Sequence, residues 1–155
     1  MIKSKTISTN IRVTKKFTLD FAHALDGYDG LCKNIHGHTY HFSVTLLGPI
    51  RNDEGHSKNG FVIDFKDLKT IVKTEIIDVF DHSLVLNEMS DIAKSAVLTD
   101  FSERIIYTSF QPTCENLLVH FVELVIPRLP LEIKLITARL DETPSSFAEW
   151  FLADQ

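Results

Sequence analysis

Three histidines lie where two extended segments would bring their imidazoles together. His36 and His38 are separated by one glycine, and residues two apart project from the same face of a strand. His23 ends an upstream alternating segment in phase with its apolar residues. If the two strands pair antiparallel, the end of the first lies beside the start of the second, and the three rings converge. Three neutral imidazoles with an open fourth position are the ligands of catalytic zinc, so the spacing predicts a Zn²⁺ site.

The other histidines do not fit this site. A short His-Gly-His sequence by itself is also compatible with a turn that carries two incidental polar residues. A metal site is favoured only because His23 lies on the same face of its own strand as the apolar residues. His41 has the opposite strand phase, His56 lies in a polar stretch, and His120 flanks an apolar helix stripe. Surface or packing roles are predicted for His41, His56 and His120.

A thiol precedes the histidine pair by four residues. Cys32 lies in a stretch that follows Gly30, and a thiol beside a metal or an imidazolium loses its proton more readily than its unperturbed pKa of roughly 8.5 implies. Its thiolate could then act as a general base. The alternative is a buried thiol with a structural role.

The elements that would position these groups begin with two alternating segments. Residues 11–25 and 36–47 each alternate apolar and polar side chains, which predicts half-buried strands. The Gly- and Asp-rich residues 26–30 join them as a loop, and residues 51–60 form a polar excursion.

Two helices and two more strands follow. Asp64 is placed to cap a helix whose apolar stripe extends to Phe80, and Thr113 is placed to cap a second that Pro127 closes. Between them, a short helix over 91–97 and a short strand over 104–108 are predicted, and strands over 132–140 and 146–151 end the chain. The order ββααββ predicts an α+β fold with an antiparallel four-stranded sheet.

Composition limits the classes of function. The 155 residues are 44% hydrophobic and 24% charged, as in one globular domain, here taken as residues 1–155. A formal net charge of −5 argues against a broad nucleic-acid surface, and no apolar run approaches the roughly 18 residues of a membrane span. Two cysteines and a polar segment, Met1–Asn10, without an apolar signal core predict a cytoplasmic protein with free thiols.

The ordered motifs resemble the 6-pyruvoyltetrahydropterin synthase family, and most of all its bacterial branch, the 6-carboxytetrahydropterin synthases of queuosine biosynthesis. The motifs that carry the resemblance span about Phe17 to Phe151 and are Phe21-Ala22-His23, Cys32-Lys33-Asn34-Ile35-His36-Gly37-His38, Gly60-Phe61-Val62-Ile63-Asp64-Phe65, Asp81-His82 with Leu86-Asn87, Pro112-Thr113-Cys114-Glu115-Asn116, and Glu142-Thr143. The resemblance implies a tunnelling (T-fold) domain with two helices on one face of the sheet. It also implies a homohexamer with active sites at subunit interfaces.

The resemblance implies a role for each matching residue. His23, His36 and His38 match the family's zinc ligands, and Cys32 matches its catalytic cysteine. Asp81 and His82 match its proton relay. Glu142 and Thr113 match residues of the pterin pocket, with Glu115 as a secondary candidate. Some positions depart from the family pattern. Cys114 replaces a hydroxyl residue of some relatives, and residues 88–111 form a longer stretch that carries no recognisable motif.

Three of these residues also have simpler interpretations. Glu142 shares the phase of Ala138 and Leu140, so its carboxylate needs a partner, either the guanidine-like edge of a pterin or a salt bridge at the strand end. Asp81 could cap local backbone with His82 solvated, and Glu115 suits the first turn of its helix through the helix dipole.

The function expected from the resemblance is that of a zinc-dependent lyase. It would convert 7,8-dihydroneopterin triphosphate and water to 6-carboxy-5,6,7,8-tetrahydropterin, acetaldehyde and triphosphate. The three residues between Cys32 and His36 favour this reaction over the pyruvoyl synthase reaction, which eliminates triphosphate without cleaving the side chain. A zinc-containing pterin or purine binder without turnover, or a metal-dependent hydrolase of such rings, is the alternative from another class.

Overall fold

A long antiparallel hairpin forms the centre of the fold. The computed structural model describes residues 9–155, so most of the polar segment Met1–Asn10 lies outside the described residues. Strand β1 (Asn10–His23) pairs with β2 (His36–Pro49) over their whole length, with His23 opposite His36. Both predicted strands are confirmed. β1 ends at His23 because the Leu25 N–H donates to the Cys32 carbonyl within the connecting loop.

The complete sheet has six strands in the order β4-β3-β1-β2-β5-β6. β5 (Lys134–Thr143) and β6 (Ser146–Phe151) continue the antiparallel part, as predicted. β3 (Leu84–Asn87) and β4 (Ile105–Thr108) run parallel to β1, so the prediction of four antiparallel strands is wrong in strand number and direction. β3 was missed because its first three side chains are all buried and show no alternation.

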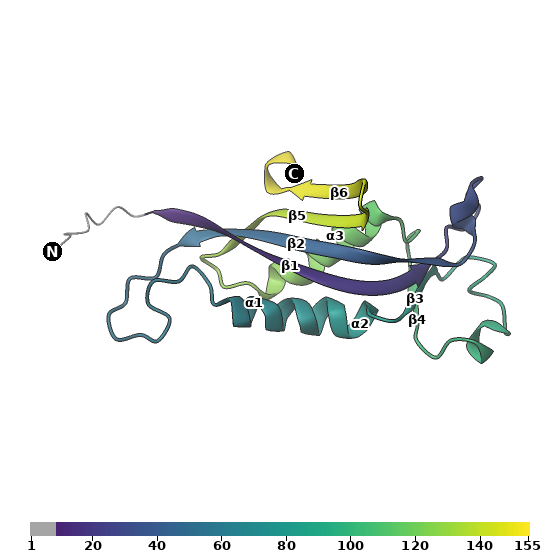
Figure 1. Ribbon diagram of the computed structural model, residues 1–155, viewed down its shortest axis with the longest axis horizontal. Coiled ribbons are helices and arrows are strands. Elements are labelled where there is room, and N and C mark those ends of the chain that lie inside the picture. The colour runs from purple at the N-terminus through teal and green to yellow at the C-terminus, as the bar shows by residue number, and fades with distance from the viewer. Residues whose placement is uncertain (1–8) are drawn as a thin grey trace.

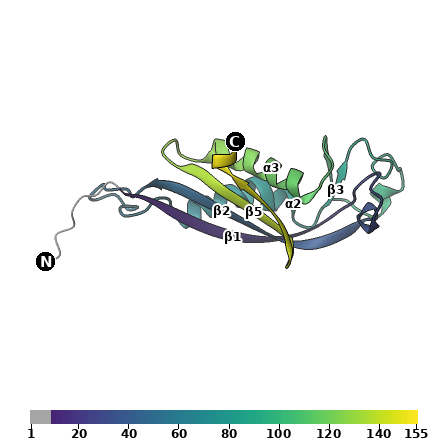
Figure 2. The same cartoon turned by 90° about the horizontal axis from the view of Figure 1, so that it is seen from above.

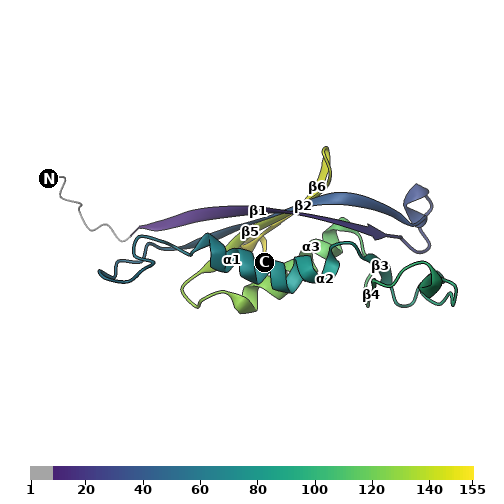
Figure 3. The same ribbon diagram turned by 60° about the horizontal axis from the view of Figure 1, so that its bottom comes forward.

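The helices cover one face of this sheet (Figures 1 and 3). α1 (Phe65–Val72), a π-helical turn (Lys73–Ile77) and α2 (Asp78–Phe80) form one continuous helical stretch, and α3 (Cys114–Val125) lies beside it. The predicted caps are confirmed: the Asp64 carboxylate accepts from Lys66 N–H, and the Thr113 hydroxyl accepts from Asn116 N–H. Within residues 9–155, the opposite face of the sheet carries no α-helix, as Figure 2 shows.

Side chains of alternate strand residues pack against the helices to form the core. Phe42 of β2 contacts Phe121 of α3 edge to face, and Phe80 of α2 packs against both Phe121 and Phe21. The three histidines lie at one end of this inward-facing row, directly after Phe21 on β1 and before Tyr40 on β2. The metal-site candidates therefore continue the apolar core.

The segment between β3 and β4 contains turns in place of the helix predicted over 91–97. The Ser90 hydroxyl accepts from Ala93 N–H, and a 3₁₀ turn (Leu98–Asp100) follows. Only a small cluster of apolar residues here packs on Ala24 and β3, too few to stabilise a regular helix. Within residues 9–155, no helix combines the length and apolarity needed to cross a membrane.

Candidate metal centre and active site

The ligand atoms of His23, His36 and His38 lie within 4.8 Å of one another. The register of the hairpin explains this, because His23 is directly opposite His36 and Phe21 is opposite His38. His23 is almost fully buried, at 1% exposure, while His36 and His38 are half-buried. The convergence predicted from strand phase is therefore present in the folded chain.

Hydrogen bonds to backbone carbonyls leave two of these rings with a free Nε2. His23 Nδ1 lies 2.7 Å from the Pro112 carbonyl oxygen, and His36 Nδ1 lies 2.8 Å from that of Asn34. Because a carbonyl only accepts, each Nδ1 carries the proton and each Nε2 presents a lone pair. Such carbonyl contacts are the usual way in which proteins orient metal-binding histidines.

The positions of the Nε2 atoms fit a divalent metal. His23 Nε2 and His36 Nε2 are 3.2 Å apart, near the separation of about 3.3 Å expected for two nitrogens bound to one tetrahedral zinc. Two lone pairs at this distance repel unless a cation or a proton lies between them. His38 Nε2 is buried without a hydrogen-bond partner, and a metal would satisfy it. The residues present therefore fit a three-histidine metal site.

Burial disfavours the charged form of two of the three rings. Burial lowers the pKa of His23, and the neighbouring His36 lowers it further, although the Pro112 carbonyl and Glu142 oppose the shift. Burial also lowers the pKa of His38, against the opposing effect of Glu142. Neutral imidazoles are the metal-binding form, so the shifts favour metal binding near neutral pH.

A carboxylate lies beside the three rings. Glu142 Oε1 is 3.7 Å from His23 Nε2 and 3.9 Å from His38 Nε2, and the Tyr40 hydroxyl donates to it over 3.3 Å. The adjacent Asp141 instead pairs with Arg139. Of the two neighbouring acids, Glu142 is therefore the one directed toward the candidate metal centre.

The Tyr40 hydroxyl was missed by the sequence reasoning. Strand alternation indicates only that Tyr40 lies on the apolar face of its strand, yet a tyrosine in that position also buries a polar atom that needs a partner. Its ring is fully buried and stacks on Phe21 at 4.1 Å. Burial, the Glu142 carboxylate and, more weakly, Cys114 and Cys32 raise the pKa of Tyr40, which stays a hydrogen-bond donor.

The predicted catalytic thiol lies in the loop between the two strands. Cys32 occupies a short 3₁₀ turn (Leu31–Lys33), is half-buried and is not part of a disulfide. The second thiol, Cys114, is buried in α3, where its Sγ donates to the Leu140 carbonyl and burial raises its pKa to about 12. Of the two cysteines, Cys32 is the one with access to solvent.

The beginning of α3 reaches the metal centre through its backbone. Pro112, which contacts His23, directly precedes the cap residue Thr113, and Thr113 is half-buried there. Glu115 is exposed in the first helical turn, and the structure gives it no contact with the three histidines. This position agrees with the simpler interpretation of Glu115 as a favourable charge at the helix start.

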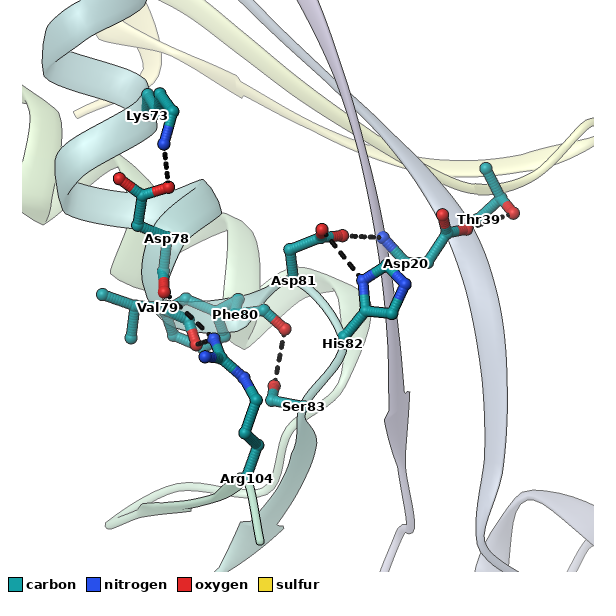
Figure 4. Close-up of polar contacts among 10 residues, drawn as sticks. All are labelled: Asp20, Thr39, Lys73, Asp78, Val79, Phe80, Asp81, His82, Ser83 and Arg104. Carbon is teal, nitrogen blue, oxygen red and sulfur yellow. Dashed lines mark hydrogen bonds and ion pairs between the residues drawn. The ribbon is translucent and has the colours of Figure 1, made fainter. Parts of the chain in front are cut away.

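Asp81 and His82 form a hydrogen-bonded pair at the edge of β1 (Figure 4). His82 Nδ1 lies 2.9 Å from Asp81 Oδ2, and Asp81 Oδ1 accepts from the Asp20 N–H at 2.8 Å. The imidazole of His82 is 77% exposed. Asp81 lies just past the last turn of α2, as predicted, and it binds both His82 and the backbone of β1.

His82 and one candidate metal ligand, His38, line the same depression. Asp20, Ala22, Gly37 and Thr39, which alternate with the inward-facing residues, line this depression together with Phe21 and Ser83. Among residues 9–155, no hydrogen bond joins Asp81 or His82 to the three histidines. One chain therefore does not bring all the predicted site residues into direct contact.

Comparison with known sequences gives consistent matches over nearly the whole chain. The sequence profile of the 6-pyruvoyl tetrahydropterin synthase family matches residues 12–151. A 6-carboxy-5,6,7,8-tetrahydropterin synthase of Haemophilus influenzae is 34% identical over 143 residues, covering 90% of this chain and 97% of the relative. A putative 6-carboxy-5,6,7,8-tetrahydropterin synthase of Pyrococcus horikoshii is 32% identical over 154 residues, covering 92% and 90% of the two chains.

Solved structures show the same fold at lower sequence identity. An uncharacterized protein from Wolinella succinogenes superposes with a TM-score of 0.73 at 20% identity, covering 94% of this chain and 99% of its own. The 6-pyruvoyltetrahydropterin synthase of Plasmodium vivax gives a TM-score of 0.69 at 20% identity, covering 92% and 97%. At this identity the superpositions establish the fold, and the sequence matches carry the family assignment.

Proposed function

Because the chain belongs to the 6-pyruvoyl tetrahydropterin synthase family, we propose that it is a pterin synthase, a zinc-dependent lyase that acts on 7,8-dihydroneopterin triphosphate. Its products would be 6-carboxy-5,6,7,8-tetrahydropterin, acetaldehyde and triphosphate, in the route to queuosine. The convergence of three imidazoles beside one carboxylate is the observation that carries this proposal. The names of the relatives at 34% and 32% identity support the carboxy product.

The metal would be held by the Nε2 atoms of His23, His36 and His38. When bound, zinc supplies a Lewis acid that stabilises negative charge on the substrate's side-chain oxygens. The carbonyls of Pro112 and Asn34 fix the tautomers of His23 and His36, so the protein presents its ligand atoms before the metal arrives.

Glu142 would anchor the pterin ring. Two parallel hydrogen bonds from the guanidine-like edge of the ring to the carboxylate would fix the ring plane and direct the substrate's side chain toward the histidines. The donor Tyr40 holds Glu142 Oε1, which limits the rotation of the carboxylate. Thr113 would line the same pocket from the start of α3.

Proton transfer would be carried by Cys32, Asp81 and His82. The Cys32 thiolate would take a proton from a carbon of the substrate's side chain, and the His82 imidazole would return one. Asp81 accepts from His82 Nδ1–H, so the opposite nitrogen, Nε2, is free to exchange a proton. These three roles rest on the family relationship and on the accessibility of the groups.

We further propose that the protein acts as a homohexamer in the cytoplasm. The sheet ends in two strands, β4 and β6, each with one unpaired edge within residues 9–155, and edges of this kind can join sheets of neighbouring subunits. An interface site would let the His82 of one chain serve the metal centre of another. A reducing compartment would keep both thiols free.

Product identification tests the function. Purified zinc-loaded protein is incubated with 7,8-dihydroneopterin triphosphate, and acetaldehyde is assayed together with the pterin product. Acetaldehyde and the carboxy product in equal amounts are expected. Release of triphosphate with a pyruvoyl product and no acetaldehyde would establish the pyruvoyl synthase reaction instead, and ring binding without any product would leave the chain a pterin-binding protein.

A further inference from the structure

The turn that carries Asp81 and His82 is attached to β1 by three hydrogen bonds. The Asp20 N–H donates to Asp81 Oδ1, the His82 N–H donates to the Asp20 carbonyl over 2.6 Å, and the Ala22 N–H donates to the Ser83 carbonyl over 2.9 Å. The Asp81 carboxylate thus occupies the place of a backbone carbonyl just before the parallel pairing with β3 begins. These bonds fix the turn relative to β1. Other contacts fix the turn relative to α2.

His82 adopts a conformation that needs such support. Its φ angle is 59°, in the left-handed region, where a side chain with a Cβ is sterically strained. A residue stays there only when its surroundings hold it. The contacts on both sides of the turn therefore decide where the imidazole points.

Arg104 holds both ends of this turn, and Figure 4 shows its guanidinium at the end of α2. Its guanidinium nitrogen Nη2 donates to the carbonyls of Asp78 and Val79, at 3.0 Å each, which are among the last carbonyls of α2. Its own backbone carbonyl accepts from the Leu84 N–H at 2.8 Å, at the start of β3. One residue thus binds the chain before Asp81 and again after His82.

Electrostatics act in the same direction as these hydrogen bonds. A guanidinium at a helix C-terminus interacts favourably with the helix dipole. Partial burial opposes ionisation of Asp81, but the Asp20 N–H, His82 and the charge of Arg104 together lower its pKa. Asp81 is thereby kept as the anion that accepts a hydrogen bond from His82 Nδ1.

We propose that Arg104 is a positioning residue for the Asp81–His82 pair, setting the direction of the His82 imidazole by fixing both ends of the turn. It comes from residues 88–111, the part of the chain without a recognisable motif, and gives that segment a role in the active site. The inference rests on the proposed function in one respect, namely that Asp81 and His82 take part in turnover.

The test compares three variants of the zinc-loaded protein. Arg104→Met removes the charge and the donors at similar length, Arg104→Lys retains the charge, and Arg128→Met is the matched control because it removes a surface arginine paired with Glu75 elsewhere. For each, kcat, KM, zinc content, thermal stability and amide hydrogen exchange are measured. The exchange of the His82 and Ala22 amides reports the turn independently of any reaction.

The expected result is a loss confined to turnover and to this turn. Arg104→Met should lower kcat about tenfold with KM and zinc content unchanged, since the pair acts in proton transfer and not in binding. Exchange of the His82 and Ala22 amides should speed up about tenfold, with amides in the centre of β2 unchanged, and Arg104→Lys should restore part of both. Arg128→Met should match the unmodified protein.

Three outcomes would overturn the inference. In a protein that turns over, wild-type kcat in Arg104→Met would show that the guanidinium does not position the pair. A uniform rise in exchange over all amides, with no rescue by lysine, would show a general stabilising role. If the unmodified protein forms no product, the proposed function fails, and unchanged exchange at His82 and Ala22 would then reject the positioning role separately.

Discussion

At the scale of single residues, hydrogen-bond chemistry decides which atoms remain available. The carbonyls of Pro112 and Asn34 occupy the Nδ1 atoms of His23 and His36, so their Nε2 atoms are left to bind a metal. His38 adds a buried Nε2 without a partner. Three such atoms in one place are costly without a cation and favourable with one.

Replacement of a single ligand tests the metal centre. His38→Ala is expected to reduce zinc content to well under one per chain, because two imidazoles bind zinc more weakly than three. His41→Ala is the matched control, since His41 lies on the same strand with the opposite phase and bonds Thr18. Metal analysis of both variants, purified without chelators, measures the effect. Full zinc in His38→Ala would show that this ring is not a ligand.

The Tyr40 hydroxyl is predicted to act on ligand binding and not on the metal. Tyr40→Phe removes one oxygen and leaves the stacking on Phe21 in place. Without its donor the Glu142 carboxylate can turn, so we expect Kd for a pterin analogue to rise about fivefold to tenfold, near the value of one hydrogen bond of about 1–1.5 kcal/mol. Fluorescence titration with the pterin gives Kd, and metal analysis should find unchanged zinc. An unchanged Kd would contradict this role.

At the scale of elements, the turn after α2 is joined to the edge of β1 by three hydrogen bonds, and a carboxylate accepts one of them. Asp81 Oδ1 accepts from the backbone of Asp20, sixty-one residues away in the chain. The carboxylate closes the gap between a helix that has ended and a strand that begins at Leu84. The position of His82 follows from this junction, which combines a helix end, a strand edge and Arg104.

This junction predicts a dependence of stability on pH. The pKa of Asp81 is lower in the folded chain than its ordinary value of 3.8, so protonation favours the unfolded state. The stabilisation by Asp81 is present above about pH 4 and is lost as pH falls through the lower, folded-state pKa. Asp81→Asn should therefore unfold at lower urea concentration than the unmodified protein at pH 7, and the gap should narrow below pH 4.

The control for this comparison lies on the same helix. Asp78→Asn breaks an ion pair with Lys73 at the surface, where both side chains are about half exposed, and such pairs contribute little. It should lower the urea midpoint at pH 7 by less than Asp81→Asn does. Equal midpoints for the two variants at pH 7 would argue that Asp81 is only another surface charge.

At the scale of the whole molecule, one sheet positions both parts of the chemistry. Its helix-covered face carries the buried His23, and His82 lines a depression that also includes His38. Both ends of the sheet have unpaired edges within residues 9–155. A hexamer with sites between subunits would bring the His82 of one chain to the metal centre of another.

Mixing of inactive subunits tests this arrangement. Cys32→Ala and His82→Ala should each be nearly inactive alone while retaining zinc, because neither residue is a ligand. If Cys32 of one chain acts with His82 of another, random reassembly of equal amounts should restore about a quarter of the sites. Activity after denaturation and joint refolding, with subunit number from sedimentation, measures this. No recovery in a mixed hexamer would place both residues in the same chain's site.

The zinc-ligand candidates and their convergence were predictable from the sequence because they depend on short-range rules. Strand phase selects His23, His36 and His38 and excludes His41, and a hairpin with a short connection places the first beside the second. Cap residues likewise marked the starts of α1 and α3 at Asp64 and Thr113. These signals lie within one strand, one hairpin or one helical turn.

Contacts between distant segments were decided only by the tertiary structure. β3 carries no alternation and pairs with β1 only because Asp81 and His82 bring it to that edge, and the helix predicted over 91–97 lacks the apolar partners that would have stabilised it. Tyr40 meets Glu142 across 102 residues, and Arg104 meets the end of α2 across 25. The ligands of the metal are thus set by local periodicity, whereas the orientation of the groups around it depends on which distant backbone and side-chain atoms the fold brings within hydrogen-bonding distance.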